Sequence, residues 1–483
     1  MEARLKNLDY AFNPRSIAFV GATETMNKWG FLILNNLLTG GYRGDIYPVN
    51  PGRDTILGLK AFPTVTDIPG DVDLAIFTVP ANRVIGALDE CIAKRVKAGV
   101  VISAGFRELG GEGAAMETEL VKRGSRTDMA IIGPNCQGIC CPASRLYPWM
   151  PILYHPPRGT IGFVSQSGNI LNMLIGHAVT AGFGASKGVS SGNEALIKTE
   201  GYLEYFSRDK DTEVIVSYVE GVNDGRALLE RARQVSRRKP VVMLKGGRTQ
   251  SGVSAAKSHT GAMAVSGKLF DAACRQAGII LVSSIEEAGI TAASFVNRPL
   301  PRGKRVGIVT GGGGLVVFND TASTEKGLEV AKLSSDTLAE LGKLLPGWWV
   351  PGNPVDLVAG LDFTVIKPVI EILMKSGDVD AVMFLWIGAP RLGRAIDTSR
   401  GGMDISAVWD IMRDHFREYS RELYDLMQEL RIPLYVSTNF RPEEISGDTE
   451  LPGDKNLLIY PSVESACQSI SAMVTYQEYL QSS

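Results

Sequence analysis

The sequence predicts an α/β protein built from three domains in series. Short apolar runs of strand length alternate with segments of helical pattern along most of the chain. Strands that are apolar on both faces need a parallel sheet covered by helices on both sides. With 483 residues the chain is too long for one ordinary core, and domains of about 150 residues predict roughly three of them.

The N-terminal series of strands is expected to form a ligand-binding rim. Its strands are SIAFVGA, DIYPVNP, DLAIFTVP, AGVVISAGF and MAIIGPNCQGI, with helical patterns between them. In parallel sheets of this kind, ligands bind at the carboxyl ends of the strands. Those ends lie near Gly21, Asn50, Pro80, Ser103 and Asn135, so we expect five loops to converge on one edge.

Two proline-rich segments separate this series from two later ones. RLYPWMPILYHPPRG is expected to be a linker, after which the pattern restarts with TIGFVSQSGNI and continues to AGIILVSSIEEA. RPLPRGKR forms a second link, and RVGIVTGGGGLVVFND opens a third series that ends in NLLIYPSVESACQSI. The predicted domains are therefore residues 1–145, 158–297 and 303–475.

Composition excludes several classes of function. Hydrophobic residues make up 45% of the chain, charged residues 21%, and the net charge is −2, as in ordinary globular proteins. The sequence has no long run of Lys or Arg, so we expect no nucleic-acid partner. No apolar stretch approaches the roughly 20 residues that cross a bilayer, and the N-terminus has no signal-peptide core. We expect a cytoplasmic protein that does not enter a membrane.

Six cysteines in so long a chain do not indicate a disulfide framework. Cys136, Cys140 and Cys141 cluster, but no second Cys or His pair stands at a zinc-like spacing. We expect buried thiols and no metal site.

One of the four histidines, His259, lies in a loop of small residues, KGGRTQSGVSAAKSHTGA. Taken alone, this position is typical of an exposed or locally hydrogen-bonded histidine without a catalytic role. The small neighbours also leave room for a phosphoryl donor to reach the imidazole, which can accept a phosphoryl group covalently. His155, His177 and His415 lack this setting, because they fall in a proline-rich segment or in helical patterns.

A phosphate near that histidine needs hydrogen-bond donors, and two turns offer them. FVSQSGN ends a strand and opens a helix, and the start of a helix binds anions through its free N–H groups. VTGGGGLVVFND contains a second glycine-rich turn, although such turns also occur for packing alone. The candidate phosphate-binding residues are Ser165, Gln166, Ser167, Gly168, Gly312 and Gly313.

Glu220 ends the strand VIVSYVE and is a candidate catalytic residue. A carboxylate at a strand end near a histidine fixes the imidazole tautomer and stabilises its positive charge. The alternative is an acid that the macrodipole of the following helix favours. The residues alone leave both interpretations open.

The first turn, VGATETMNKWG, does not match the GxGxxG dinucleotide fingerprint, because only Gly21 and Gly30 are glycines. The Asn50–Pro51 turn also has no acidic residue for an NAD ribose. Both features argue against an NAD-dependent oxidoreductase. Lys28 and Arg53 stand where a diphosphate or a 3′-phosphate would be met, or are solvated side chains.

As a set, these motifs resemble the NDP-forming acyl-CoA synthetases, the family of the succinyl-CoA synthetase α subunit. SIAFVGA, the PVNP turn, VISAGF, GPNCQGI, FVSQSGN, SSGNEA, SYVEG, KSHTGA and GNPVDL look like the blocks of that family, in its order. The resemblance spans essentially the whole chain. It implies a Rossmann-like CoA-binding domain followed by two flavodoxin-like ligase domains. The residues it implies for CoA binding are Gly21, Thr23, Lys28, Asn50, Pro51, Val79, Pro80, Ser103 and Asn135.

The resemblance also implies an activity. Acyl-CoA, phosphate and a nucleoside diphosphate are interconverted with a small organic acid, CoA and ATP or GTP, with His259 phosphorylated during turnover and supported by Glu220. No ATP-grasp segment is recognisable in the chain, so the nucleotide and its Mg²⁺ are expected on a separate ATP-grasp β subunit in an α2β2 assembly. The alternative is a CoA sensor without turnover, which would need only the first domain.

Two features depart from the family pattern. Leu196 stands where the family usually has an acid after SSGN, and the contacts of that loop are in doubt. The Trp348–Trp349 pair before GNPVDL and the charged stretch from Arg391 to Tyr424 are also unusual for the family.

Overall fold

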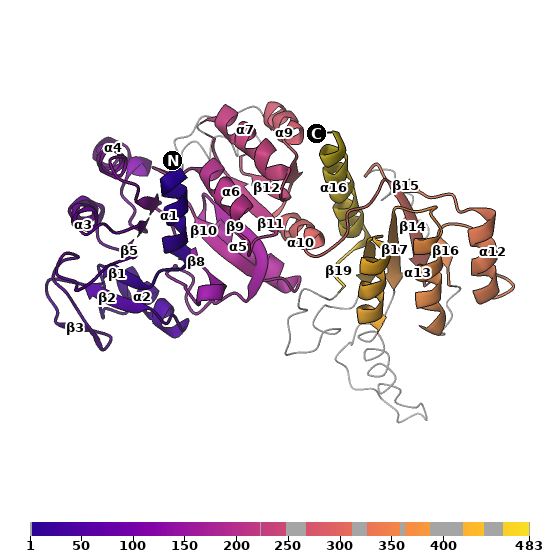
Figure 1. The fold of residues 1–483 in the computed structure, drawn as a ribbon, viewed down its shortest axis with the longest axis horizontal. Helices are drawn as coiled ribbons and strands as arrows, with labels where there is room; N and C mark the ends of the chain where they lie inside the picture. Colours follow the sequence, from indigo (N-terminus) through magenta and orange to yellow (C-terminus); the bar gives the residue numbers. More distant parts are fainter. Residues whose placement is uncertain are drawn as a thin grey trace, which may run out of the picture. The chain divides into compact units, whose positions relative to one another are not determined.

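The computed structural model describes residues 2–222, 224–247, 267–311, 326–357, 363–386, 419–438 and 457–482. The chain divides into two compact units, one of Met1–Val179 with Gly184–Ala292 and one of Thr180–Phe183 with Ala293–Ser483. Both contain parallel sheets flanked by helices, which confirms the predicted α/β class (Figure 1). Among the described residues, no helix has both the length and the apolar character needed to span a bilayer.

The first sheet of unit 1 has the order β2-β1-β5-β6-β7, and every neighbouring pair is parallel. Each of its strands begins in a segment that the apolar runs predicted. Its strands are β1 (Ser16–Val20), β2 (Asp45–Val49), β5 (Leu74–Phe77), β6 (Ala98–Val101) and β7 (Ala130–Ile132), with a small hairpin of β3 (Thr55–Ile56) and β4 (Leu59–Lys60) beside them. Its helices are α1 (Glu2–Phe12), α2 (Trp29–Thr39), α3 (Ala81–Ala93), η1 (Arg107–Leu109) and α4 (Gly111–Gly124).

The second sheet of the same unit has the order β13-β12-β11-β9-β10-β8, in which β8 alone is antiparallel. Its strands are β8 (Ile139–Cys140), β9 (Arg158–Ser165), β10 (Ala185–Ser190), β11 (Val214–Val219), β12 (Val241–Lys245) and β13 (Ile279–Val282). Its helices are η2 (Pro142–Ser144), α5 (Gly168–Thr180), α6 (Thr199–Arg208), α7 (Gly225–Ser236), α9 (Gly267–Gln276) and α10 (Ile285–Phe295).

MAIIGPNCQGI does not form the single strand expected from its sequence. Its first part is β7 in the first sheet, and its last part begins β8, which pairs with β10 in the second sheet. Between them Gly133 and Asn135 have positive φ values of 93° and 55°, and the Gly133–Pro134 peptide is cis. This turn carries the chain from one sheet to the other.

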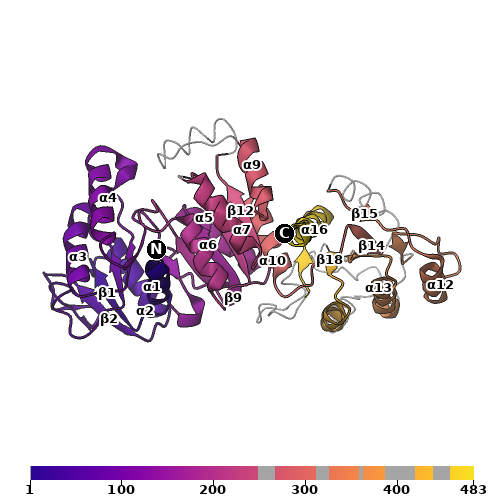
Figure 2. The same cartoon turned by 45° about the horizontal axis from the view of Figure 1, so that its top comes forward.

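Helix α1 joins the two sheets of unit 1 into one core. It contacts β6 and β7 of the first sheet and α6 of the second (Figure 2). Phe12 stacks on Tyr205 with ring centroids 5.5 Å apart, and the Tyr205 hydroxyl donates to Asp9 at 2.9 Å. The segment expected to be a linker is also packed, since Tyr147 and Trp149 are buried and Asn36 of α2 donates to both of their carbonyls.

Unit 2 contains the third predicted series around the sheet β15-β14-β17-β18-β19, with β16 pairing to β14. GNPVDL, which was not assigned to a strand from the sequence, contributes β16. Its strands are β14 (Arg305–Thr310), β15 (Glu329–Val330), β16 (Val355–Asp356), β17 (Ala381–Trp386), β18 (Leu434–Thr438) and β19 (Ile459–Tyr460). Its helices are α12 (Ser335–Leu344), η4 (Phe363–Val365), α13 (Ile366–Lys375) and α16 (Val463–Ser482).

Leu196, the residue that departs from the family pattern, is a packing residue. It is buried in the core that surrounds the first sheet. A Cβ atom added to Gly124, the last residue of α4, would lie 2.4 Å from the Leu196 Cδ1 atom. The leucine therefore packs the loop after β10 against the N-terminal half of unit 1.

Replacing Leu196 by alanine should destabilise unit 1. Removing a buried leucine costs about 2–5 kcal/mol, because apolar contact is lost and a cavity is left. We expect the unfolding transition of unit 1 to move to a lower temperature in calorimetry. Leu109→Ala is the matched control, since Leu109 is 76% exposed, and an equal shift in both variants would contradict the packing role.

Candidate functional site

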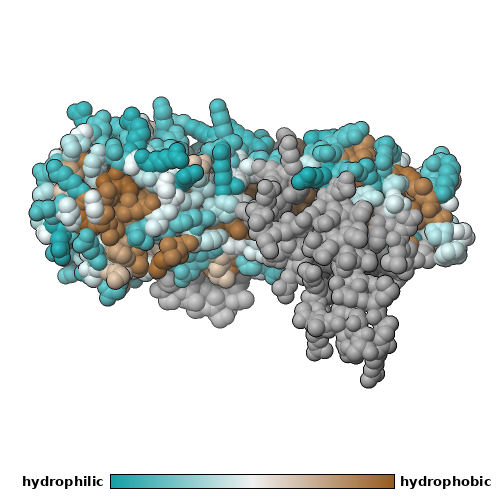
Figure 3. Space-filling model, turned by 90° about the horizontal axis from the view of Figure 1, so that it is seen from below, coloured by the Kyte–Doolittle hydropathy of each residue, from teal (hydrophilic) through white to brown (hydrophobic). Residues whose placement is uncertain are grey.

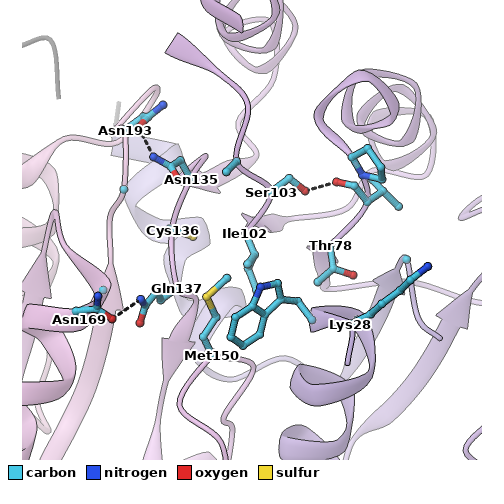
Figure 4. A pocket seen from close by; sticks show the side chains of 18 of the residues that line it. Lys28, Thr78, Ile102, Ser103, Asn135, Cys136, Gln137, Met150, Asn169 and Asn193 are labelled. Carbon is cyan, nitrogen blue, oxygen red and sulfur yellow. Dashed lines mark hydrogen bonds between the residues drawn. The ribbon is translucent and has the colours of Figure 1, made fainter. Parts of the chain in front are cut away.

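A cavity of about 720 Å³ lies in unit 1, where the carboxyl ends of the first sheet face the start of α5 (Figure 4). The rim predicted from the sequence supplies one side of it, and the FVSQSGN turn supplies the other. The cavity therefore joins two candidate sites that lie far apart in the sequence.

Seven of the nine residues expected at a CoA site line this cavity, and they are Gly21, Thr23, Lys28, Val79, Pro80, Ser103 and Asn135. The Ser103 hydroxyl donates to the carbonyl of Val79 at 2.5 Å, which ties two strand ends together. Asn50 and Pro51 lie outside its lining. The Asn50 amide instead donates to the carbonyl of Ala22 at 2.8 Å and holds the neighbouring turn.

The start of α2 lies unusually close to the end of β1. Gly21 has a φ of +94°, and a Cβ atom on Gly30 would lie 2.2 Å from the Gly21 carbonyl oxygen. Only glycines allow this approach. The positive end of the α2 dipole and the exposed Lys28 thus face one end of the cavity, a setting that fits an anionic group such as a diphosphate.

The middle of the cavity is largely apolar. Ile102 and Met150 line it (Figure 4). Trp29, which is 47% exposed, also belongs to the lining of the cavity. Trp29 also belongs to the exposed apolar residues of unit 1, along with Met26, Ile152 and Leu153, and hydrophobic residues gather on the face of this unit seen in Figure 3. Such a wall fits an extended apolar chain better than a second charged group.

The other end of the cavity is the turn before α5. Gln166, Ser167 and Gly168 line it, and the first N–H groups of α5 have no acceptor within the helix. Ser165 lies outside the lining and shapes the turn, since its buried hydroxyl donates to the Ser167 carbonyl at 2.5 Å. A Cβ atom on Gly168 would lie 2.1 Å from the Gln137 Cγ atom, so glycine is required where these two segments meet.

Glu220 is half-buried at the end of β11 and is tied to this turn by its backbone. Its N–H donates to the Gln166 Oε1 atom at 2.7 Å, and its carbonyl accepts from the Lys245 Nζ atom at 2.6 Å. Burial, assisted by the neighbouring Glu220 carboxylate, raises the pKa of Tyr218 to about 12. Burial lowers the pKa of Lys245, and the same carboxylate opposes that shift.

Three predicted site residues, His259, Gly312 and Gly313, lie outside the described residues. The histidine and the second glycine-rich turn therefore stay predictions. Among the described candidates, the structure brings Glu220 next to Gln166, and it brings the turn of residues 165–168, the predicted phosphate turn, to the same cavity as the predicted CoA rim at the strand ends of the first sheet.

Several lining residues were not singled out from the sequence. Asn193 lies in the SSGNEA block, and its side-chain oxygen accepts from Asn135 at 3.2 Å (Figure 4). Its amide donates to Glu108 at 2.7 Å and to Glu117 at 2.8 Å. Burial opposes ionisation of Glu108, but hydrogen bonds from Asn193 and from three backbone amides lower its pKa. Met150 gave no signal, because it lies in the segment expected to be a linker.

Two segments of the chain match known domain families. Residues 15–142 match the CoA binding domain, and residues 158–295 match the succinyl-CoA ligase like flavodoxin domain. These matches define the class of protein: a CoA-binding domain joined to a ligase-type flavodoxin domain.

Longer similarities cover the rest of the chain. The α subunit of acetate–CoA ligase [ADP-forming] II of Pyrococcus furiosus is 35% identical over 451 residues, which cover 91% of this chain and 96% of that subunit. Acetate–CoA ligase [ADP-forming] I of Archaeoglobus fulgidus is 38% identical over 376 residues, and the match covers 54% of that longer protein. The dinucleotide forming acetyl-coenzyme A synthetase 1 of Ca. Korarchaeum cryptofilum, solved with phosphate and ADP, has 31% identity and a TM-score of 0.83, with 98% of both chains covered.

This chain therefore belongs to the NDP-forming acyl-CoA synthetases, the family of these ADP-forming ligases. The resemblance stated from the motifs is confirmed. The relatives named here are ligases, and the alternative of a CoA sensor without turnover has no support among them.

The thiol of Cys136 should be inert although it lines the cavity. Cys136 is 4% exposed, and burial raises its pKa to about 12. At about pH 8 only about one thiol in ten thousand is then the reactive thiolate. All six cysteines are buried, as expected. A thiol reagent should label the native protein slowly and all six cysteines after denaturation, whereas rapid labelling of Cys136 would contradict this environment.

Proposed function

We propose that this chain is the α-type subunit of an ADP-forming acyl-CoA ligase and that the cavity of unit 1 is where CoA and phosphate meet. The observation that carries the proposal is the continuity of this one cavity from the rim of the first sheet to the start of α5. An acyl group that passes from sulfur to phosphate needs both partners within bonding distance at the same time.

The residues of the cavity support this use in three steps. The Gly21–Gly30 turn and Lys28 receive the diphosphate of CoA, and the apolar wall of Ile102 and Met150 accompanies the pantetheine arm toward α5. The N–H groups at the start of α5 hold phosphate beside the thioester. Thr23, Val79, Pro80, Ser103 and Asn135 complete the proposed CoA site, with Asn50 and Pro51 supporting it from the neighbouring turn.

The proposed reaction has three balanced transfers. A phosphate oxygen attacks the acyl carbon of acyl-CoA, the carbon–sulfur bond breaks, and acyl phosphate and CoA leave. The imidazole of His259 then takes the phosphoryl group and releases the organic acid, while Glu220 stabilises the charge on the ring. A nucleoside diphosphate finally collects the phosphoryl group, and the reverse sequence makes acyl-CoA.

The nucleotide site is proposed on a partner chain. The Pyrococcus furiosus relative is named as an α subunit, and the longer relatives contain segments that this chain does not match. We propose an ATP-grasp β subunit that binds ADP or ATP with Mg²⁺, in an α2β2 assembly. The acid is a small organic acid, and the names of the relatives include acetate and 4-hydroxybutyrate as substrates.

Replacing Gly30 by alanine should weaken CoA binding about ten-fold or more, because the new methyl group pushes the start of α2 away from Gly21 and misaligns its N–H groups. Titration calorimetry of the full chain with CoA measures the effect. Gly86→Ala is the matched control, since a Cβ atom at Gly86 meets nothing within 4 Å and lies inside helix α3. Unchanged CoA affinity in Gly30→Ala would argue against CoA at this turn.

Replacing His259 by asparagine should abolish both the phosphoenzyme and the overall reaction. The chain with its partner is incubated with radiolabelled ATP, and acid-labile, base-stable phosphate is mapped by mass spectrometry. Asparagine keeps a polar side chain of similar size but cannot accept the phosphoryl group. Retention of either the label or the turnover in His259→Asn would refute the proposed carrier.

A further inference from the structure

The buried acid Glu194 has a place in this site that the reaction above does not use. It lies in the loop between β10 and α6, is 5% exposed, and has a φ of +53°. A non-glycine residue in this left-handed region is strained, and such strain often marks a functional site. Burial raises the pKa of the Glu194 carboxyl group, and hydrogen bonds oppose that shift.

Three neutral side-chain donors hold the carboxylate. The hydroxyls of Ser191 and Thr199 donate to its Oε1 atom at 2.8 and 2.7 Å. The Gln166 Nε2 atom donates to its Oε2 atom at 3.1 Å. The first two donors belong to the same loop or to the start of α6. The third donor, Gln166, belongs to the turn before α5. Glu194 therefore links the loop between β10 and α6 to the cavity.

The side-chain amide of Gln166 connects Glu194 to the backbone of Glu220. Its oxygen accepts from the backbone N–H of Glu220 at 2.7 Å and of Gly221 at 3.1 Å. Its nitrogen donates to the Gly221 carbonyl at 3.0 Å and to Glu194. If the amide were reversed, its NH₂ group would face two N–H donors and its oxygen would face two acceptors. Only one orientation satisfies all four contacts.

We propose that Glu194 is a positioning residue, which fixes the amide of Gln166 and through it the backbone of Glu220 beside the phosphate turn. The proposal rests on the proposed function, in which Glu220 supports the phosphorylated histidine. Glu194 touches none of the reacting groups in this scheme, and its effect reaches the reaction through Gln166.

A purely structural role explains less of the geometry. A buried carboxylate costs more to desolvate than a neutral or apolar side chain would. The contacts with Ser191 and Thr199 close the loop by themselves. The hydrogen bond from Gln166 is not needed to hold that loop closed. It connects Glu194 instead to a residue that lines the cavity. A carboxylate is the side chain that can accept from all three donors and donate to none.

The test compares Glu194→Gln with Glu200→Gln in the full chain. Glu200 is the matched control: it lies at the start of the same helix, and burial raises its pKa too, but it belongs to no part of the proposed site. In Glu194→Gln the new NH₂ group competes with its oxygen for the place opposite Gln166, and the Gln166 amide loses its fixed orientation.

Two measurements test the proposed role of Glu194. Hydrogen–deuterium exchange of peptides that contain Glu220 and Gly221 should be faster in Glu194→Gln than in the wild type, because both N–H groups lose a fixed acceptor. Phosphorylation of His259 by a radiolabelled acyl phosphate should slow about ten-fold, while the Kd for CoA stays within about two-fold. Glu200→Gln should match the wild type in both. The double variant Gln166→Ala with Glu194→Gln should be no slower than Gln166→Ala alone.

Unchanged exchange at Glu220 and Gly221 in Glu194→Gln would overturn the proposal whatever the labelling shows. A parallel loss of CoA affinity would also overturn it, since that result identifies a general structural role. Labelling of His259→Asn, or none of the wild type, would refute the phosphohistidine instead. The exchange measurement does not depend on that chemistry, so the two failures are distinguishable.

Discussion

The site depends on one backbone seam between the turn after β7 and the loop after β10. The N–H groups of Asn193 and Ala195 donate to the carbonyls of Pro134 and Gly133 at 2.9 and 3.1 Å. A Cβ atom on Gly192 would lie 2.3 Å from the Pro134 carbonyl oxygen, so the seam closes only with glycine there. Because this seam joins the first sheet to the second, it sets how the rim of the first sheet faces the turn before α5.

Polar side chains add hydrogen bonds on both sides of this seam. Each gives partners to buried polar groups, which would be costly to leave without a hydrogen bond. Asn193 bridges Asn135 to Glu108 and Glu117 on the side of the first sheet. Glu194, the next residue, holds Gln166 on the side of the second. Adjacent residues of one loop thus contact both the turn after β7 and the turn before α5. A shift of this loop would disturb both sets of hydrogen bonds together. An apolar side chain at either position would leave the buried partners without a hydrogen bond.

The sequence was a good guide to local features and a poor one to long-range contacts. The strands from SIAFVGA to AGVVISAGF follow from apolar runs, and the rim residues Gly21 and Ser103 follow from the position of strand ends. The crossing of GPNCQG from one sheet to the other leaves no periodic signal, because it is an irregular turn with three positive φ values, at Gly133, Asn135 and Gly138. Asn50 stays a predicted CoA-site residue, and its hydrogen bond to Ala22, which holds the neighbouring turn, is visible only in three dimensions.

The apolar middle of the cavity shows why motifs alone do not identify the acid. Motifs report groups that bind phosphate, because backbone N–H groups need glycines and helix starts at fixed spacings. Apolar groups of a ligand are held by dispersion and burial, and the apolar lining residues Ile102, Met150 and Trp29 share no sequence spacing. Residues 29, 102 and 150 come from a helix start, a strand end and a packed connecting segment. A methylene group in an apolar pocket is worth only about 1–3 kcal/mol, so the choice of acid can change through side chains that belong to no motif.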